Sequence, residues 1–590
     1  MHSYSLHFII ALSVSTVLSV IFCHTLKKKL LAFLVYPAFF YSLFYNYDYV
    51  LYLGSLSPII IAYVGAIFST FVFLFFSRLK VDKLGFKECK TNVFSIVAFF
   101  LFQYICVAYT YVIPWAIDTF PLSNVEAVLF TLFAGTNEGA EEFVISSFIE
   151  KVFKPSYPTF FMLFFLQLLA AFALQKRKIS LSFKLWKLKH SIYGNSLKRV
   201  TLQIQKIILV LLAIYCTIQS LVLPGIVMSS PFQALFQQPV DSELYRAHYI
   251  HPDSIQVDAP SPPRNLIVIM LESMETNFAQ YTPEIIELQK QNQNFYPGGV
   301  NVSGTSWTIA AITGKLCGIP LNMPMGIEEY LGKLPTYLPG AKCLMNILEN
   351  KGYSQVYMQG SSGDFTQKRT FWTVHGNVAV HDIEYYKHVG KIPNDYHIFW
   401  GFEDRKLYQF AKEELDSLSK LGKPFALYML TVDTHQPEGF LDDYCSTQFN
   451  SDEGKLPRVL RCTSKQLSEF LLWAQIQSWY NNTVISVMGD HAMPMLSPKA
   501  NVPPTDSLYW TNFIINSIIQ EPIRERQYSS LDVFPTLLES IGYVLENRGI
   551  ALGRSLYSDS LTMLELYGRH TLDSLLRVRS IQYDKFLFGK

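Results

Sequence analysis

Charged residues are scarce in this chain, and neither sign of charge dominates. Asp, Glu, Lys and Arg make up 16% of the 590 residues, against about 25% in an ordinary soluble domain. The net charge is only +2, which excludes a protein that binds polyanions through bulk positive charge, so we expect no nucleic-acid partner. Half of the residues are apolar and 15% are aromatic. This composition excludes a disordered chain and indicates contact with a membrane.

Cysteine is also rare, and the C-x-x-C spacing of common zinc sites is missing. Of the eight cysteines, four lie in or beside long apolar runs near the N-terminus. The others form two sequence-local pairs, Cys317 with Cys343 and Cys445 with Cys462, which are 26 and 17 residues apart. In an oxidising compartment such an even set indicates two disulfides. A zinc cluster is the alternative, which the missing cysteine and histidine spacings disfavour.

The charges are divided unevenly along the chain. Residues 1–230 hold 19 Lys and Arg against 9 Asp and Glu, whereas the remainder holds 30 against 38. The first part also contains apolar runs near the length of about 20 residues that a bilayer core requires. We therefore predict a multi-span α-helical membrane domain over residues 1–227 with about six transmembrane helices. The six runs are 6–23, 30–45, 59–76, 93–113, 159–174 and 207–223.

The basic residues of the first part are clustered in three of the loops between these runs. Residues 27–29, 78–90 and 176–206 hold 17 of the 19. Since basic loops favour the cytoplasmic side, all three are expected there, which places everything after residue 223 outside. A cleaved signal peptide is the alternative for the first run, but no basic segment precedes it.

The second half has the pattern of an α/β domain. After a Pro-, Gln- and Ser-rich segment at 228–263, interpreted as a linker, comes the apolar run Asn265–Leu271. Similar short runs follow at 355–358, 425–430 and 483–488, with helical patterns at 403–419 and 464–478 between them. Continuous apolar strands are typical of a parallel sheet covered on both faces. We therefore predict an α/β catalytic domain over residues 264–590 with a mainly parallel central sheet.

Three predicted strands are followed directly by acidic or histidine side chains. Glu272 follows the first, Asp433 and His435 follow the third, and Asp490 and His491 follow the fourth. Ligands of such sheets bind beyond the carboxyl ends of the strands. Carboxylates and neutral imidazoles are ligands of divalent metals, so their recurrence there predicts a metal site. Any one of them alone would more often be a helix cap or a solvated side chain.

The segment from Ser303 to Thr308 combines a glycine with several hydroxyl groups before an apolar helical run. This pattern predicts a tight turn that leads into a helix N-terminus, where backbone amides favour an anion. An ordinary N-cap is the alternative. A metal-bound hydroxyl at this position would lose its proton and become a nucleophile for a phosphorus or sulfur ester.

Together these segments resemble the alkaline phosphatase and sulfatase superfamily. Within it they are most similar to the phosphoglycerol transferases that modify periplasmic glucans, with the lipoteichoic acid synthases as related members. The motifs that carry the resemblance are Leu271-Glu272-Ser273, Gly304-Thr305-Ser306-Trp307-Thr308, Gly318-Ile319-Pro320, Asp433-Thr434-His435 and Gly489-Asp490-His491.

The resemblance implies one divalent metal, Mn²⁺ or Zn²⁺, bound by Glu272, Thr305, Asp490 and His491. It implies Thr305 as the catalytic nucleophile, since Thr305 lies 13 residues before Gly318, as the nucleophile of lipoteichoic acid synthases does before its Gly-Leu-Pro. Thr308 is the second candidate, because the phosphoethanolamine transferases have a slightly different count.

The resemblance also implies a set of substrate-binding residues. His435 would hold the phosphate or protonate the leaving group, and one of two neighbouring basic residues would complete the phosphate pocket, with the choice left open. The set is His435, Lys368, Arg369, Trp307 and Asp433. Because the Cys-x-Pro-Ser-Arg signature of true sulfatases is missing from the sequence, we expect no sulfatase activity.

The function expected from this resemblance is a transfer of phosphoglycerol from phosphatidylglycerol to an envelope glycan, a glucan or a lipopolysaccharide-type acceptor. The transfer would pass through a phosphothreonine-type intermediate and release diacylglycerol. The expected location is the bacterial inner membrane, with the catalytic domain in the periplasm. The alternatives are a phosphoethanolamine transferase acting on lipid A or another envelope glycan, a catalytically silent envelope binding protein and, on the six spans alone, a transporter.

Overall fold

The computed structural model describes most of the second half of the chain. The described residues are 239–254, 260–322, 337–436, 438–449, 454–493, 509–520 and 524–589, together with 148–161, 181–185, 188–192 and single positions between 104 and 111. The six expected spans lie outside the described residues except for short pieces. Among the helices that are described, none is both long enough and apolar enough to cross a bilayer.

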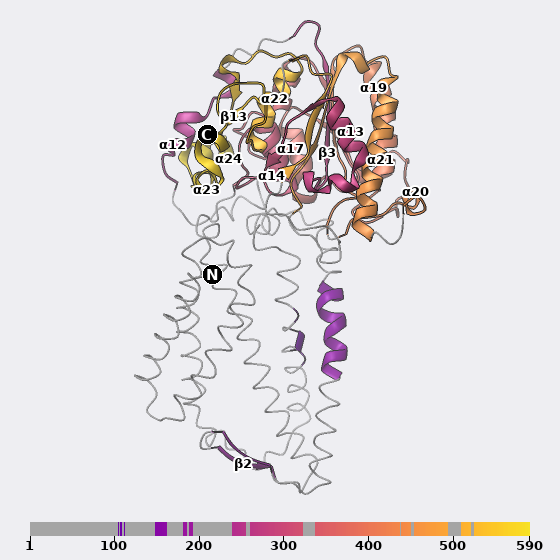
Figure 1. Cartoon of the computed structure of the whole chain (residues 1–590), viewed down its shortest axis with the longest axis vertical. Helices are drawn as coiled ribbons and strands as arrows, with labels where there is room; N and C mark the ends of the chain where they lie inside the picture. The colour runs from indigo at the N-terminus through magenta and orange to yellow at the C-terminus, as the bar shows by residue number, and fades with distance from the viewer. Residues whose placement is uncertain are drawn as a thin grey trace. The chain divides into compact units, whose positions relative to one another are not determined.

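The chain divides into two compact units (Figure 1). The described residues up to 192 belong to the first unit, where β1 (Leu181–Leu185) pairs with β2 (Leu188–Ile192) in an antiparallel hairpin. The described residues from 239 to 589 all belong to the second unit.

A seven-stranded sheet forms the centre of the second unit. Five neighbouring strands run parallel, whereas β11 is antiparallel to β9 and β4 is antiparallel to β11. The central strands are fully buried, as their continuous apolar sequences predict. The spatial order is β4 (Gln293–Asn294), β11 (Asn512–Ile515), β9 (Thr483–Gly489), β3 (Asn265–Leu271), β8 (Phe425–Leu430), β6 (Ser354–Gln359) and β7 (Ala379–His381).

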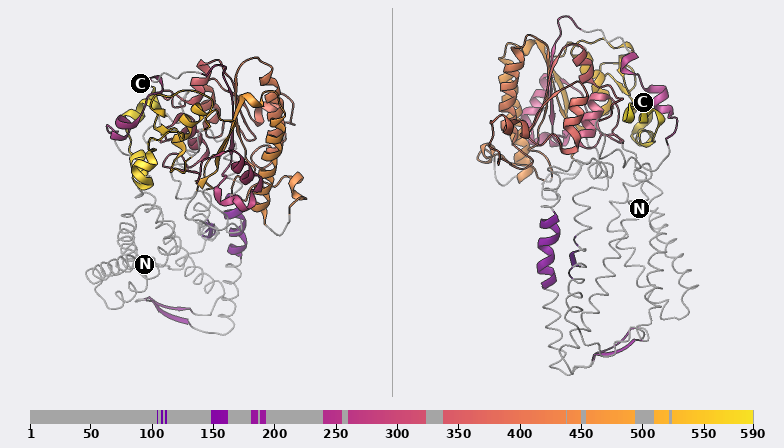
Figure 2. Two further views of the ribbon diagram at one scale, coloured as in Figure 1. Left: turned by 45° about the horizontal axis from the view of Figure 1, so that its top comes forward. Right: turned by 180° about the vertical axis from the view of Figure 1, so that it is seen from behind.

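Alternate residues of the strands enter two separate hydrophobic cores, because successive side chains of a strand point to opposite faces. Leu266 and Val268 of β3 pack into one core, and Ile267 and Ile269 into the other. Helices cover both faces of the sheet (Figures 1 and 2). The first core includes α14 (Thr308–Cys317), α16 (Leu344–Asn350), α17 (Lys368–Val374) and α22 (Val533–Ser540), and the second α13 (Pro283–Gln291), α18 (Ile383–His388), α19 (Asp404–Ser419) and α21 (Lys455–Gln475).

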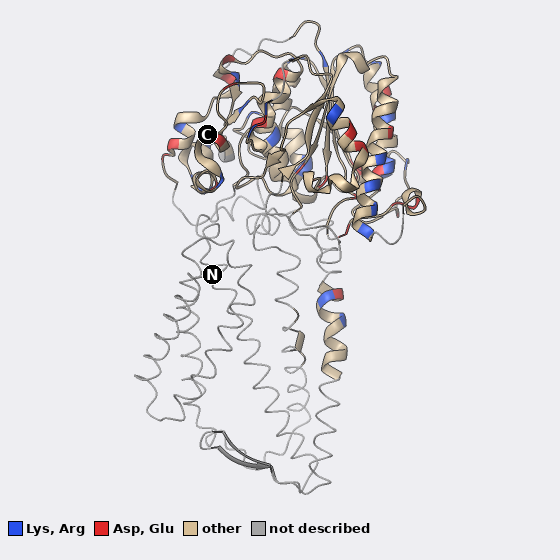
Figure 3. Ribbon diagram, viewed as in Figure 1, with Lys and Arg blue, Asp and Glu red and all other residues tan. Residues whose placement is uncertain are grey.

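Charged side chains lie mainly on the outer helices of this unit, including α19 and α21, and are sparse on the central strands (Figure 3). Two short antiparallel pairs complete the strands of the unit: β5 (Gly299–Val300) with β10 (Tyr509–Trp510), and β12 (Gly549–Ile550) with β13 (Gly553–Arg554). Some charged groups are nevertheless buried, and Glu272, Asp433 and Asp490 among them follow strands of the sheet.

The described part of the expected linker, residues 239–254, is packed onto the domain. It contains α12 (Glu243–His248), whose Leu244 and Tyr245 are buried. The ring of Tyr245 lies near Tyr583 and Phe586 of α24 (Ile581–Phe588), with centroid distances of 6.2 and 6.0 Å. The Pro- and Gln-rich composition suggested a linker, but the aromatic residues within it supply enough apolar surface to anchor this part. Next to α24 in sequence lies α23 (Met563–Arg577).

Both expected disulfides are present. Cys317, the last residue of α14, is bonded to Cys343, which precedes α16. Cys445 in α20 (Asp443–Ser446) is bonded to Cys462 in α21. The first bond joins two segments of the same hydrophobic core, and the second ties the short helix α20 to α21.

Candidate metal centre and active site

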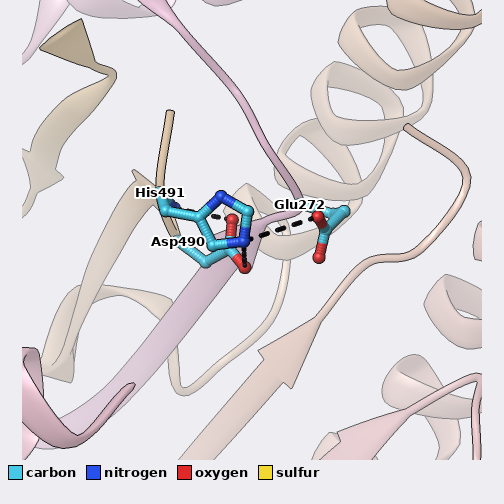
Figure 4. A group of neighbouring side chains, drawn as sticks. All are labelled: Glu272, Asp490 and His491. Carbon is cyan, nitrogen blue, oxygen red and sulfur yellow. Dashed lines mark hydrogen bonds and ion pairs between the residues drawn. The ribbon is translucent and has the colours of Figure 1, made fainter. Parts of the chain in front are cut away.

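The sheet brings three side chains together at the carboxyl ends of its two central strands. Glu272 follows β3, and Asp490 and His491 follow β9, whose residue Gly489 pairs with Leu271. One ligand atom from each of the three lies within 4.8 Å of the others, and all three residues are buried (Figure 4). Nε2 of His491 is 3.8 Å from Oε1 of Glu272 and 3.4 Å from Oδ2 of Asp490.

The backbone at this point has no room for a larger residue than glycine at position 489. A Cβ atom there would lie 2.3 Å from the carbonyl oxygen of Met274 and 3.0 Å from Cβ of Trp510. The Asp490 amide donates to the carbonyl of Leu271 at 3.0 Å, so the strand pairing continues into the site. Close backbone approach therefore fixes where the Asp490 and His491 side chains emerge.

The hydrogen bonds around the three residues leave one buried carboxylate oxygen without a donor among the described residues, whereas Oε1 of Glu272 accepts from the Ser273 hydroxyl at 2.7 Å. Oδ1 of Asp490 accepts from the amides of Ser273 and His491, whereas its buried Oδ2 has no hydrogen-bond partner among the described residues. Nδ1 of His491 donates to the carbonyl of Ala492 at 2.9 Å, which directs the Nε2 lone pair toward the carboxylates. An orphaned buried oxygen and a lone pair beside two carboxyl groups fit a divalent cation.

Electrostatics support the same interpretation. Burial raises the pKa of Asp490 to about 6, and the nearby Glu272 adds to the shift. Burial lowers the pKa of His491, but the carboxylates of Asp490 and Glu272 more than offset this, and the pKa lies above its ordinary value. Buried carboxyl groups that repel one another retain protons. A bound divalent cation can replace these protons and stabilise the ionised carboxylates.

Two threonines lie near this cluster, and their hydroxyl groups have different partners. Oγ1 of Thr308, the first residue of α14, is 3.5 Å from Nε2 of His491. Oγ1 of Thr305 instead donates to the carbonyl of Val302 at 2.8 Å and accepts from its amide at 2.9 Å. The Thr305 hydroxyl is therefore hydrogen-bonded within its own turn, and the Thr308 hydroxyl borders the cluster of Glu272, Asp490 and His491.

Two residues beyond the neighbouring strands extend the site. His435 follows β8, and its Nδ1 donates to the carbonyl of Gln436 at 3.1 Å, which leaves a lone pair on Nε2. Burial lowers the pKa of His435 to about 4, so the ring is neutral at pH 7. Lys368, the first residue of α17, is buried, and this burial lowers its pKa to about 8, although Glu272 acts in the opposite direction.

Arg369 is held differently from Lys368. Its Nε donates to Asp364 at 2.7 Å, and it also forms an ion pair with the buried Asp382. The Lys368 ammonium group donates to the carbonyl of Phe365 at 2.9 Å and to Oγ1 of Thr366 at 3.4 Å, and among the described residues it forms no ion pair with a carboxylate. An unneutralised buried amine is the better anion ligand of the two.

Several known proteins are similar to this chain in sequence or structure. A family model described as sulfatase matches residues 264–543. Residues 264–543 are therefore similar to the sulfatase family.

The chain is similar to two curated relatives named phosphoglycerol transferase I. The one from Xanthomonas campestris pv. campestris is 32% identical over 264 residues, which cover 44% of this chain and 37% of the relative. The one from Citrobacter koseri is 32% identical over 256 residues, which cover 42% of this chain and 33% of the relative. The chain thus spans about a third of the length of the curated relatives it matches.

Two solved structures are similar to this chain at lower identity. A protein of the alkaline phosphatase superfamily from Vibrio parahaemolyticus has a TM-score of 0.41 and 22% identity, covering 56% of this chain and 80% of that one. The lipoteichoic acid synthase LtaP from Listeria monocytogenes has a TM-score of 0.41 and 20% identity, covering 51% and 79%.

Trp307 and Asp433, two further residues of the expected substrate-binding set, are both buried. Trp307 precedes α14 and packs into the hydrophobic core, with 9% of its surface exposed. Asp433 is buried, and its Oδ2 accepts from the amide of Asp404 at the start of α19. Burial and the neighbouring Asp404 raise the pKa of Asp433 well above its ordinary value. Its contacts are those of a residue that joins the loop after β8 to a helix.

Sequence reasoning missed two residues that hold the loop after β9. Oδ1 of Asn301 accepts from the amide of Ala492 at 2.9 Å, while its Nδ2 donates to the carbonyl of Thr305 at 2.6 Å. The buried Glu275 accepts from the amide of Met493. Asn301 thus connects the loop after β9 with the threonine turn. Nothing in the spacing of these residues indicated such a contact.

Proposed function

We propose that the chain is a metal-dependent membrane transferase that moves phosphoglycerol from phosphatidylglycerol to an extracytoplasmic glycan. The observation that supports this most directly is the Thr308 hydroxyl, which borders a buried cluster of two carboxylates and an imidazole at the start of a helix. The similarity to phosphoglycerol transferases I supports the choice of donor.

The proposed metal ligands are Glu272, Asp490 and His491, joined by the oxygen of Thr308. A bound divalent cation would lower the pKa of the hydroxyl and neutralise charge on the phosphoryl oxygens. Mn²⁺ and Zn²⁺ both suit a mixed oxygen and nitrogen ligand set. We propose Thr308 rather than Thr305 as the nucleophile, because the Thr305 hydroxyl is hydrogen-bonded to the backbone carbonyl and amide of Val302.

The proposed reaction has two displacements at phosphorus. In the first, Oγ1 of Thr308 forms a bond to the phosphorus of phosphatidylglycerol, the bond to the diacylglycerol oxygen breaks, and the threonine proton ends on diacylglycerol. In the second, a glycan hydroxyl attacks phosphorus and the bond to Thr308 breaks. Nε2 of the neutral His435 accepts the proton of the glycan hydroxyl and returns it to Thr308.

Lys368 and the N-terminus of α14 would hold the phosphoryl oxygens, because a buried amine and free helix amides both favour an anion. The membrane domain expected over residues 1–227 would keep the enzyme on the surface that contains its lipid donor. Tethering of this kind raises the effective concentration of a membrane-confined substrate. We accordingly propose the inner membrane as the location, with the catalytic domain in the periplasm.

The experiment that tests the proposal measures diacylglycerol release by the detergent-purified full chain. Phosphatidylglycerol and phosphatidylethanolamine are supplied separately, each with Mn²⁺, with Zn²⁺ and with EDTA. We expect metal-dependent release from phosphatidylglycerol and none in EDTA. Release from phosphatidylethanolamine alone would instead identify a phosphoethanolamine transferase, and no release from either lipid with any metal would contradict both.

A further inference from the structure

A two-residue turn made of aromatic residues lies beside His435. The Ile398 amide donates to the carbonyl of Gly401 at 2.6 Å, and the Gly401 amide donates to the carbonyl of Ile398 at 2.9 Å. Phe399 and Trp400 therefore form the tip of the turn. Phe399 has a φ of 57°. Tight turns of this kind normally place Gly or Asn at positive φ, and a bulky residue there is strained. The strained backbone at Phe399 therefore costs free energy of folding, and it places two aromatic rings at this position.

The turn is attached rigidly to the end of strand β6. Gly401 bridges to Ser361, and the amide of Phe402 donates to the carbonyl of Gly360 at 3.0 Å. A Cβ atom at Gly401 would lie 2.0 Å from that carbonyl oxygen. Two backbones in such close contact leave the turn little freedom, so the positions of the two rings are set by the sheet. Strained but rigid backbone is typical of ligand-binding positions.

Trp400 neighbours both the proposed proton acceptor, His435, and the aromatic ring that lies under the proposed phosphate ligand, Lys368. The centroid of Trp400 is 4.6 Å from that of His435 and 5.7 Å from that of Phe365, over which the Lys368 ammonium lies at 4.8 Å. Phe399 stacks on Phe440 at 6.2 Å and keeps 37% of its surface exposed. The turn thus presents an aromatic surface next to the proposed proton acceptor of the second displacement.

One more polar group beside His435 lacks a protein partner. Oε1 of Gln436 is buried and has no hydrogen-bond partner among the described residues. A ligand hydroxyl could supply the missing donor, because a buried oxygen of this kind is costly if it stays unpaired. The site therefore combines aromatic faces with a hydrogen-bond acceptor and an imidazole lone pair.

We propose that Phe399 and Trp400 form a subsite for one sugar ring of the acceptor, with a ring hydroxyl directed toward His435 and Gln436. This inference rests on the proposed transfer reaction. A sugar ring has an apolar C–H face that packs on an aromatic ring and hydroxyl groups at its edge that need polar partners. A lipid acyl chain would leave the Gln436 oxygen and the imidazole unpaired, so the observations favour the sugar over the lipid.

Binding and catalysis by the full chain in detergent test the subsite separately. Calorimetric titration with cellotetraose, laminaritetraose and chitotetraose measures sugar binding in the absence of lipid. We expect Trp400→Ala and Phe399→Ala each to weaken binding about fivefold to tenfold. In the transfer assay, both variants raise KM for the sugar and leave KM for phosphatidylglycerol unchanged. Trp473→Ala, a half-buried tryptophan on α21, is the matched control and should change neither.

Several results would overturn the subsite. The first is that none of the three oligosaccharides binds. The second is that both aromatic variants bind sugar as tightly as the unaltered chain. The third is a raised KM for phosphatidylglycerol in place of the sugar, which would assign the rings to the lipid. Thr308→Ala separates this inference from the proposed function. It should bind sugar as the unaltered chain does while releasing no diacylglycerol. Sugar binding by a chain that releases no diacylglycerol from any lipid would refute the transfer reaction and support the subsite.

Discussion

The two sides of the proposed active site are built in opposite ways. On the side of β3 and β9, buried carboxylates are held by backbone amides, such as the Ser273 amide on Asp490. On the side of β6 and β8, half-exposed aromatic rings surround a neutral His435. The first side suits a metal ion that stays bound from one turnover to the next. The second side suits substrates that must enter and leave. Four predictions test this division.

The largest effect should come from the two threonines. Thr308→Ala removes the hydroxyl that borders His491, and we expect diacylglycerol release to fall by about 10³-fold or more. Thr305→Ala removes two hydrogen bonds with the backbone of Val302 within a turn and should reduce the rate tenfold or less. The rates are measured on phosphatidylglycerol with saturating metal, and mass spectrometry of the trapped protein locates the modified residue. The reverse ranking would restore Thr305, which motif spacing favours.

The second effect should separate Lys368 from Arg369. Lys368→Met removes an amine without a carboxylate partner, so we expect kcat/KM for phosphatidylglycerol to fall about 100-fold. Arg369→Met breaks contacts with Asp364 and Asp382 and should chiefly lower the midpoint of thermal unfolding. Equal losses of kcat/KM from both variants at unchanged stability would show that the phosphate is shared between them.

The third effect concerns the link between the metal loop and the threonine turn. Asn301→Ala removes both hydrogen bonds, and we expect metal affinity and kcat each to fall about tenfold, as for other residues that orient metal ligands. Asn301→Asp keeps the acceptor for Ala492 and loses the donor to Thr305, so metal affinity should recover more than kcat. Metal affinity is measured by calorimetry. Asn346→Ala, in the helix cap of α16, is the control that should leave it unchanged.

The sequence predicts the sheet better than it predicts the site. The strand at Asn265–Leu271 agrees with the structure, and the helix expected at 403–419 begins only one residue later. The helix expected at 464–478 begins at Lys455, because Pro457 stands in the first turn, where proline is tolerated. A buried strand is evident from its own residues, whereas a helix boundary depends on what packs against it.

The site shows the same limit more sharply. The acidic and histidine residues after the strands were predictable, because parallel strands end at one edge of the sheet. Which of two threonines faces the cluster depends on the turn before α14, and this turn is held both by the nearby Asn301 and by Asp573, which is 270 residues from Ser303. Phe399 and Trp400 gave no signal at all, since their position follows from the backbone pairing of Gly360 with Phe402.

The smallest effect is a pH dependence of stability on the metal side. Burial raises the pKa of Glu275 to about 7, although the Met493 amide lowers it. Because the ordinary value is near 4.5, the folded chain keeps a proton between these two pH values that the unfolded chain releases. Stability contributed by this group is therefore complete at low pH and is lost as pH rises toward 7. In EDTA, we expect the free energy of unfolding to fall by about 2 kcal/mol between pH 5 and pH 8. Glu275→Gln keeps an acceptor for Met493 without the ionisation, so its unfolding free energy should vary less over this range, and an unchanged slope would mean that the Glu275 carboxyl is already ionised in the folded chain.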